Sequence, residues 1–454
     1  MQADGLRPDR VHWILFLSIS VFGFLARLAC TTGLIGSDDL AYSRYAQLIA
    51  HHQYHPESIH YALRYGLTIP VAVLYGLLGV HEWTTFLLPL IASTASVPVL
   101  MIIGARLVGP RAGLLAGVLL ASFPVSLFYA TILVPEPVAG LYVLLALLLY
   151  TETERRAHPE AFALVAGLTL GISYVTKESA AFVVIAVVLD ALLRKKWTVA
   201  LGVSAGALAI VAAEYTYYLV ATGDLLYRFH AMKMHEQSAM VLAVNQNLGY
   251  RLLKSYPRLM LLPNLSFGLH STFTLVLLLG LFKWRPSRTP LLLLWAIVPL
   301  LYLNFGSSSL THFTALPVAD RYLEFCYPPL FLLAGAVMDR WTTQPVRPVR
   351  ALCAALTCTA VVAAVGFGCA YASHQKGWLT RDIAVLRKIA EAANQKHAVG
   401  LRFVADPDNR WKQSMAIIAP ELHVLTEERE AGLVIGPDAL GLPSAMTSAP
   451  VGIP

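Results

Sequence analysis

Two adjacent carboxylates, Asp38 and Asp39, follow directly after an apolar stretch near the N-terminus, within residues 36–42 (GSDDLAY). At roughly 5 Å and an effective dielectric of about 20, two such charges repel by ~3 kcal/mol. That repulsion can raise the pKa of one carboxylate and make it a useful general base. We therefore predict that the pair is catalytic. The plainer alternative is that it caps the next helix or ends a membrane span.

Other ionisable residues also border apolar stretches. They are Glu136 between two prolines, the pair Lys177-Glu178, and Arg321 before Tyr322. Each has a plain reading as a solvated turn, a snorkelling pair or a helix anchor. Ionisable groups at membrane depth are nevertheless costly and tend to be functional, so several of them converging from distant segments indicate one site.

Glycosyl transfer from a lipid phosphate fits these residue types. The acceptor hydroxyl loses its proton to a carboxylate in an oxocarbenium-like transition state, and the leaving phosphate needs no acid. It does need cations, and Lys177 and Arg321 are suited to bind it. A site on the outer membrane face has no access to cytosolic nucleotide sugars, which favours a lipid-linked donor.

The composition predicts an all-α polytopic membrane protein. Of the 454 residues 57% are hydrophobic and 13% charged, whereas soluble domains carry about 25% charged residues. The first apolar run lacks a small-residue cleavage site, so we expect it to be retained as a helix. The predicted spans are 11–34, 84–106, 111–131, 134–151, 159–176, 178–193, 197–220, 267–283, 289–305, 321–340 and 350–372.

Loop charges decide whether the further apolar stretch 62–80 also spans. If it does not, six short basic loops fall on the side of the N-terminus, as cytoplasmic loops should. We therefore predict an interfacial or re-entrant segment at 62–80, eleven spans, an inside N-terminus and an outside C-terminus. Because the basic residues lie in these short loops, the net charge of +7 does not indicate nucleic acid.

One outer loop, 221–262, is also basic, with Arg228, Lys233, Arg251, Lys254 and Arg258. It either attracts an anionic head group or is a solvated amphipathic loop.

Two domains are expected, a transmembrane domain at 1–372 and a small extracytoplasmic module at 373–454. The module should hold an amphipathic helix at 378–395, strands at 401–405 and 432–435, and a disordered tail from about 441. The five cysteines lie in apolar segments without disulfide or zinc spacing. Four histidines at 51, 52, 55 and 60 suggest a polar interfacial loop more than a metal site, and Glu214 is expected to be paired within the bundle or to neighbour an aromatic belt.

Over about residues 11–340, the order of these motifs resembles the GT-C superfamily of membrane glycosyltransferases. The likeness is to its protein O-mannosyltransferase and aminoarabinose lipid A transferase group. The matching segments are Asp38-Asp39 with Tyr42, Arg64 through Gly79 and Glu82, Glu136, Thr176-Lys177-Glu178, and Arg321-Tyr322 with Pro328. In that group the segment that matches Arg64–Gly79 is a juxtamembrane helix.

The resemblance implies an inverting transfer from a polyprenyl-phosphate donor to a lipid, protein or glycan acceptor at the outer face of the plasma (inner) membrane. It implies that Asp38 is the base and that Glu136 assists. Asp39 stands where the family has Glu, one methylene longer, and would orient acceptor or metal. Tyr42, Arg64, Lys177, Glu178, Arg321 and Tyr322 would bind substrate. The cofactor stays open, since some relatives use a divalent metal and others none.

A transporter or flippase is the alternative. It expects charges that face one another through the bundle and pairs of broken helices at the midplane, whereas the ionisable groups of this sequence gather on one face.

Overall fold

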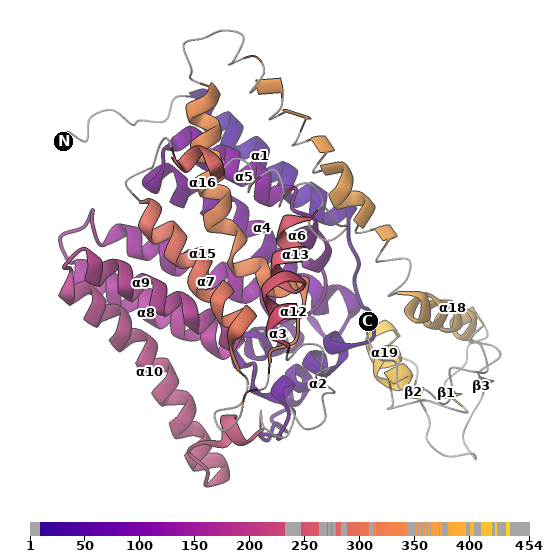
Figure 1. Ribbon diagram of the computed structural model, residues 1–454. Helices are drawn as coiled ribbons and strands as arrows, with labels where there is room; N and C mark the ends of the chain where they lie inside the picture. Colours follow the sequence, from indigo (N-terminus) through magenta and orange to yellow (C-terminus); the bar gives the residue numbers. More distant parts are fainter. Residues whose placement is uncertain are drawn as a thin grey trace.

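The computed structural model is a helical bundle with a small C-terminal group of helices and strands beside it (Figure 1). It describes residues 10–231, 247–262, 270, 274, 278–282, 288–307, 313, 315–342, much of 351–374, and 380–395, 400–403, 410–419, 423–424 and 433–435.

The long helices of the bundle coincide with predicted spans. They are α1 (Arg10–Ala29), α4 (Glu82–Leu107), α7 (Pro135–Glu152), α8 (Pro159–Thr176), α10 (Trp197–Thr222), α15 (Thr289–Phe305) and α16 (Tyr327–Thr342). Two further predicted spans are divided, one into α5 (Pro110–Ala121) and α6 (Pro124–Tyr129), the other into η2 (Glu178–Ala180) and α9 (Ala181–Leu193).

Among the described helices, four are long and apolar enough to cross a membrane by length and composition: α1, α4, α8 and α10. A helical membrane protein is therefore confirmed. The predicted spans 267–283 and 350–372 lie partly outside the described residues, so the number eleven stays a prediction.

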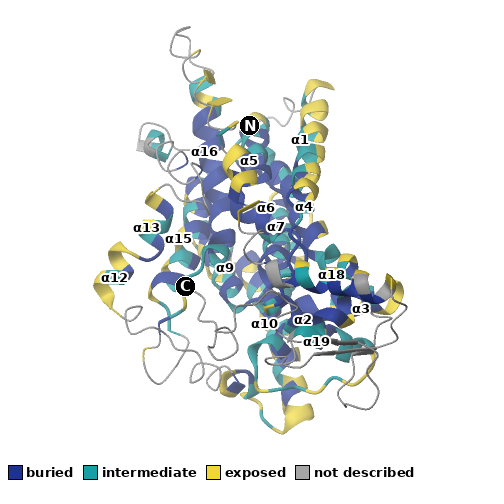
Figure 2. Ribbon diagram, turned by 90° about the vertical axis from the view of Figure 1, so that its right-hand side faces the viewer, coloured by how far each residue is buried: buried dark blue, intermediate teal, exposed yellow. Residues whose placement is uncertain are grey.

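The surface of the bundle is apolar and its centre is closely packed. Large aliphatic side chains are exposed along α1 and α10, among them Leu17 at 64% and Val220 at 82%. By contrast, α16 is buried from Tyr327 to Met338 and forms the middle of the bundle (Figure 2). Such extended apolar surface suits lipid and not water.

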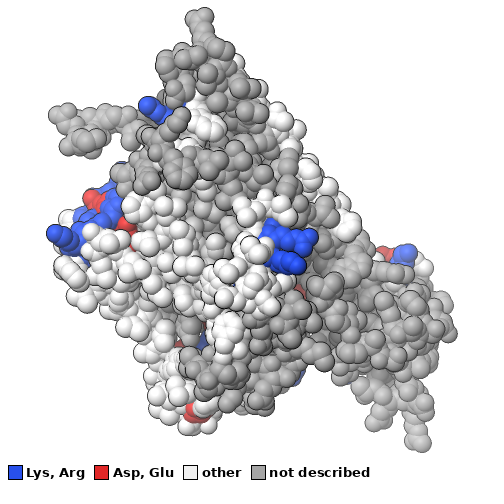
Figure 3. Space-filling view, in the orientation of Figure 1, with Lys and Arg blue, Asp and Glu red and all other residues white. Residues whose placement is uncertain are grey.

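Charged side chains gather at one end of the bundle. Glu154 forms ion pairs with Arg194 at 2.9 Å, Lys196 at 2.7 Å and Arg288. Glu152 lies 2.6 Å from Arg106. Basic residues of three predicted cytoplasmic loops therefore meet at this end, and one such charged group is visible at the left of Figure 3.

Short helices lie at the opposite end: η1 (His60–Leu63), α2 (Asp38–Ala50) and α3 (Tyr65–Leu78). At 1.5 Å per residue the 14 residues of α3 extend about 21 Å, less than the ~30 Å of a hydrocarbon core. Its length agrees with the predicted interfacial placement of 62–80. Nearby elements of later segments are α12 (Leu248–Leu253), α13 (Tyr256–Leu261) and η5 (Asp320–Phe325), whereas η4 (Leu279–Phe282) lies beside the C-terminal half of α16.

The C-terminal segment contains α18 (Arg381–Gln395), β1 (Gly400–Phe403), α19 (Arg410–Ile418), β2 (His423–Val424) and β3 (Leu433–Ile435). The three strands are parallel in the order β2-β1-β3, with Leu401 opposite both Val424 and Leu433. The sequence patterns predicted α18, β1 and β3, whereas α19 and β2 were not predicted. The tail predicted from about 441 lies outside the described residues.

Candidate active site

Asp38 is the first residue of α2 and lies among polar groups from distant segments. Its Oδ2 accepts a hydrogen bond from a terminal nitrogen of Arg321 at 2.8 Å, and its Oδ1 accepts one from the Tyr61 hydroxyl at 2.8 Å. One fifth of its side chain is exposed. The carboxylate is therefore held in one orientation while part of its surface remains accessible.

The surroundings of Asp38 favour its ionised form. Burial by itself raises the pKa of this carboxyl, but the charge and hydrogen bond of Arg321, together with the Tyr61 hydroxyl, outweigh it and hold the pKa below its ordinary value. The expectation that repulsion between two carboxylates raises the pKa of the base is therefore wrong for Asp38, because Arg321 dominates.

Asp39 points away from Asp38 and into its own loop. Its Oδ2 accepts the backbone amides of Ile35 at 2.7 Å and Gly36 at 3.2 Å, and its Oδ1 accepts that of Ser37 at 2.6 Å. Burial raises its pKa despite these three bonds, and the charge of Asp38 adds least. The side chain thus ties the loop to the start of α2, which is close to the plain reading of a helix cap.

A chain of alternating charges leads inward from Asp38. Arg321 lies 3.2 Å, through its Nε, from the fully buried carboxylate of Glu136, and the Lys177 ammonium lies 2.6 Å from the same oxygen. Tyr322 supports the two cations, since its ring centre is 3.9 Å from Lys177 Nζ and 5.6 Å from Arg321 Cζ. Two carboxylates and two cations from four segments therefore share one cluster, which we call the Asp38 cluster.

Local sequence explains how three of these groups are presented. Pro135 starts α7 and leaves Glu136 in its first turn. Lys177 caps the C-terminus of α8 in an extended conformation. Arg321 lies in η5, directly before α16. All three are helix-end positions, and they bring side chains from three segments to one end of the bundle.

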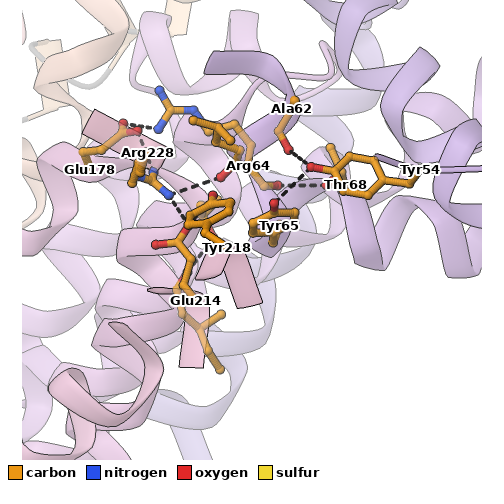
Figure 4. A network of polar contacts seen from close by, with 12 residues as sticks. Tyr54, Ala62, Arg64, Tyr65, Thr68, Glu178, Glu214, Tyr218 and Arg228 are labelled. Carbon is orange, nitrogen blue, oxygen red and sulfur yellow. Dashed lines mark hydrogen bonds and ion pairs between the residues drawn. The ribbon is translucent and has the colours of Figure 1, made fainter. Parts of the chain in front are cut away.

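Arg64 and Glu178 belong to a second, neighbouring network (Figure 4). Glu178 pairs with Arg64 and, at 2.6 Å, with Arg228; Arg228 also pairs with Glu214 and lies 4.7 Å from the ring centre of Tyr174. Neighbours in sequence, Lys177 and Glu178 thus join different networks. Arg228 is almost fully buried, so it is not a free cation for a head group, and Glu214 is paired as expected.

The other residues that the sequence singled out differ in burial. Tyr42 is buried and packs edge-on against Tyr61, with ring centres 5.1 Å apart. In the outer loop, Arg251 is buried and donates to a backbone carbonyl, while Lys254 and Arg258 are exposed. Lys233 lies outside the described residues.

Sequence reasoning missed Tyr61 as a partner of Asp38 and Arg228 as a partner of Glu178. Tyr61 carries no motif that separates it from other tyrosines. Arg228 was seen only as part of a basic loop, and its pairing depends on how that loop folds back onto α10. Within the described part of the chain, no three His, Cys, Asp or Glu side chains lie close enough together to hold a metal ion.

The Asp38 cluster can accept a proton at Asp38 and hold an anion at Lys177 and Arg321. Its carboxylates neutralise the two cations when no anion is bound, so an incoming phosphate would exchange partners with them. This is the set of groups that transfer from a phosphate-linked donor requires.

Comparisons with known proteins bear on the fold. A family model described as dolichyl-phosphate-mannose-protein mannosyltransferase matches residues 70–217. The fold is similar to that of ArnT from Cupriavidus metallidurans bound to undecaprenyl phosphate, with a TM-score of 0.62 and 15% identity over 93% of this chain and 87% of that chain. A search of the curated proteins finds no match.

An oligosaccharyltransferase from Archaeoglobus fulgidus is also similar, with a TM-score of 0.60 and 12% identity over 94% of this chain and 65% of that chain. The archaeal oligosaccharyltransferase AglB in complex with an inhibitory peptide and a dolichol-phosphate gives a TM-score of 0.54 and 13% identity over 93% and 66% of the two chains. The chain therefore has the fold of the GT-C membrane glycosyltransferases and resembles their protein O-mannosyltransferase and ArnT group.

Proposed function

We propose that this protein is an inverting membrane glycosyltransferase that moves a sugar from a polyprenyl-phosphate donor to an extracytoplasmic acceptor, with Asp38 as the general base. The observation that carries the proposal is the hydrogen bond between Asp38 and Arg321 within a cluster that also holds Glu136 and Lys177. A base and two cations at one place are what transfer from a lipid phosphate needs.

The reaction follows from these groups. The acceptor hydroxyl attacks the anomeric carbon of the donor and passes its proton to Asp38, while the bond from that carbon to the phosphate oxygen breaks. The polyprenyl phosphate leaves with both electrons of that bond. Lys177 and Arg321 stabilise the negative charge that develops on it. Attack from the face opposite the phosphate inverts the anomeric configuration.

Arg321 couples donor binding to the strength of the base. Its charge and hydrogen bond outweigh burial and lower the pKa of Asp38, which makes this carboxylate ionised but weakly basic. A donor phosphate that draws the guanidinium toward itself weakens the Asp38–Arg321 ion pair. The pKa of Asp38 then rises toward its ordinary value or above it, and Asp38 becomes a better base when substrate is present.

The other site residues take supporting roles in this proposal. Glu136 holds Lys177 and Arg321 side by side before the phosphate arrives, and Tyr322 covers both cations. Asp39 shapes the loop before α2 through its three amide contacts. Arg64 and Glu178 fix η1 and α3 against α8, and Tyr42 packs against Tyr61, the hydroxyl partner of Asp38.

The same proposal places the Asp38 cluster on the extracytoplasmic face of the inner membrane. The two ends of α7 support this: Glu136 belongs to the cluster, while Glu152 belongs to the basic end of the bundle. They are 16 residues apart, or about 24 Å of helix. If the basic end is cytoplasmic, as the charge rule expects, the cluster is outside. A lipid-linked donor is then the accessible sugar source.

Transfer by the purified full-length protein tests the proposal. The protein in lipid nanodiscs is given undecaprenyl phosphate esters of radiolabelled sugars, with solubilised total membranes of the source organism as the acceptor mixture. We expect label to move to acceptor and Asp38→Asn to lower the rate by about a hundredfold or more. Turnover by Asp38→Asn equal to that of the wild type would rule out Asp38 as the base.

Asp190→Asn is the matched control. Asp190 is a buried carboxylate on α9 that is also paired with an arginine, Arg194 at 3.0 Å, but at the basic end of the bundle. We expect its rate per folded molecule to match that of the wild type. If labelled lipid crosses the bilayer of proteoliposomes without any loss of its sugar, the protein is a transporter instead.

A further inference from the structure

Residues 30–37, which lie directly before α2 and which we call the Asp38 loop, are covered by the C-terminal segment of the chain. Leu34 and Leu40, on either side of the acidic pair, are buried in one apolar cluster with Ile383 and Leu386 of α18 and Met415 of α19. Two views place α19 beside α2 (Figures 1 and 2). Residues from opposite ends of the chain therefore form a shared core around the start of α2.

Two glycines in the loop permit this close approach. Gly33 and Gly36 have φ values of +74° and +75°, a conformation that favours glycine. A Cβ at Gly33 would lie 2.8 Å from Glu82 Oε1 and 3.8 Å from an Arg387 nitrogen, and one at Gly36 would lie 3.3 Å from Ile383. Side chains of α18 therefore lie directly against the backbone of the loop at these two glycines.

An ion pair and a hydrogen bond connect α18, α4 and the loop before α2. Glu82, the first residue of α4, accepts two hydrogen bonds from Arg387 of α18, one from Nε to Oε2 at 3.3 Å and one from a terminal nitrogen to Oε1. Glu82 Oε1 also accepts the backbone amide of Leu34 at 3.4 Å. The pair is partly exposed, with 36% of the Arg387 side chain and 25% of the Glu82 side chain accessible. It therefore anchors α18 to both the bundle and the loop.

The loop in turn sets the position of Asp38. The amides of residues 35–37 bind Asp39, and Ser37 is followed directly by Asp38 at the start of α2. If α18 moves away, Leu34 and Leu40 lose their cover and the amide contacts of Asp39 face water. A shift of about 1 Å in a catalytic group can cost a hundredfold in rate.

We propose that Arg387 and Glu82 are positioning residues, through which the C-terminal segment holds the Asp38 loop in its catalytic position. The inference rests on the proposed role of Asp38 as the base. Neither side chain touches the Asp38 cluster, so the pair acts on the turnover number and not on donor binding.

The test uses the full-length protein in nanodiscs and the variants Arg387→Glu, Glu82→Arg, the double exchange and Arg387→Lys. Hydrogen–deuterium exchange is followed in peptides that cover residues 33–40, with peptides of α7 as the internal reference. kcat and KM for the undecaprenyl-linked donor are measured in parallel. Arg44→Glu is the matched control, because it reverses a charge of α2 in an exposed pair, Arg44–Glu57 at 3.4 Å, that does not touch the loop.

We expect each single reversal to speed exchange in 33–40 only and to lower kcat about tenfold with an unchanged KM. The double exchange should partly restore both slow hydrogen exchange in 33–40 and kcat. It should not reach the wild type, because an arginine at position 82 cannot accept a hydrogen bond from the Leu34 amide. Arg387→Lys should stay close to the wild type, as should Arg44→Glu.

Two results would overturn the inference: exchange in 33–40 that does not change in Arg387→Glu, or exchange that rises equally in α7, which would make the pair a general contributor to folding. A wild-type protein without sugar transfer would sink the proposed function but not this test, because the exchange rates still report whether the pair holds the loop.

Discussion

The guanidinium of Arg321 donates a 2.8 Å hydrogen bond to Asp38 across 283 positions of sequence, while its Nε faces the buried Glu136 at 3.2 Å. One side chain thus holds the proposed base and faces the carboxylate that also binds Lys177. In the proposed reaction Arg321 therefore contacts the base and binds the donor phosphate.

Replacement of Arg321 should lower turnover strongly. A lysine offers one ammonium group and cannot serve Asp38 and Glu136 from two edges. We expect about a tenfold loss of kcat for Arg321→Lys and about a hundredfold loss or more for Arg321→Gln, as for other donors to a developing anion. Initial rates of label transfer measure both. Arg106→Gln, at the opposite end of the bundle, should transfer at the wild-type rate, and an equal loss there would point to instability in place of chemistry.

The pH dependence of kcat and kcat/KM should show that donor binding weakens the Asp38–Arg321 ion pair. In the free protein Arg321 outweighs the effect of burial and holds the pKa of Asp38 below its ordinary value, so the base is ionised at neutral pH and is protonated only at a pH below the ordinary pKa of an aspartate. kcat/KM, which reports the free enzyme, should therefore stay level on acidification to that point. kcat reports the donor complex, in which the ion pair is weakened, so its acidic limb should lie at higher pH.

Identical acidic limbs for kcat and kcat/KM would show that donor binding leaves the Asp38–Arg321 ion pair intact. The same depressed pKa has a consequence for stability. The ion pair contributes to folding above the unfolded pKa of an aspartate, and this contribution is lost as the pH falls through the lower folded value.

Substitutions of Glu136 and Lys177 should have strongly non-additive effects on the free energy of unfolding. Glu136 is completely buried, and removal of one partner of a buried pair costs about 3–5 kcal/mol because the other charge is left behind. Glu136→Gln and Lys177→Met should each lower the thermal unfolding temperature markedly. The double variant should be less destabilised than the sum of the two, with a coupling energy of about 1–3 kcal/mol.

Glu152→Gln is the control for that cycle, because it removes a carboxylate from the other end of the same helix. Its arginine partners Arg106 and Arg156 are more exposed than Lys177, so we expect a smaller cost than for Glu136→Gln. Additive effects of the Glu136 and Lys177 substitutions would mean that their 2.6 Å contact carries no net energy.

Arg228 should matter for stability and not for donor binding. It lies between Glu178 and Glu214 and is almost fully buried. Arg228→Met leaves both carboxylates without this partner and should lower the unfolding temperature, while KM for the donor stays unchanged in the folded fraction. Arg258→Met, at an exposed arginine of α13, should change neither. A raised KM in Arg228→Met would instead make the second network part of the donor site.

The helices of the bundle could be predicted from the sequence because the physical constraint that forms them acts within each segment. A backbone that crosses hydrocarbon must satisfy its own hydrogen bonds, so apolar runs of about 20 residues become helices. Charges at the ends of these runs could then be assigned to one side or the other, and the residues of the Asp38 cluster were singled out on that basis. The same reasoning identified α18, β1 and β3, since amphipathic and short apolar patterns are also local.

The directions of individual side chains depend on contacts between distant segments and were not available from the sequence. Asp38 and Asp39 are neighbours, yet one faces Arg321 and the other its own loop amides. Lys177 and Glu178 are neighbours, yet they enter different networks.

The sequence by itself thus determined an α-helical membrane protein with acidic and basic groups at the ends of its helices. Only the tertiary structure decided that Asp38 faces Arg321 while Asp39 binds its own loop amides, which charges neutralise one another, and that α18 packs on the loop before Asp38. The reason is physical: hydrophobicity fixes where a helix runs, but charge pairing and packing across hundreds of residues depend on how the helices are arranged around one another.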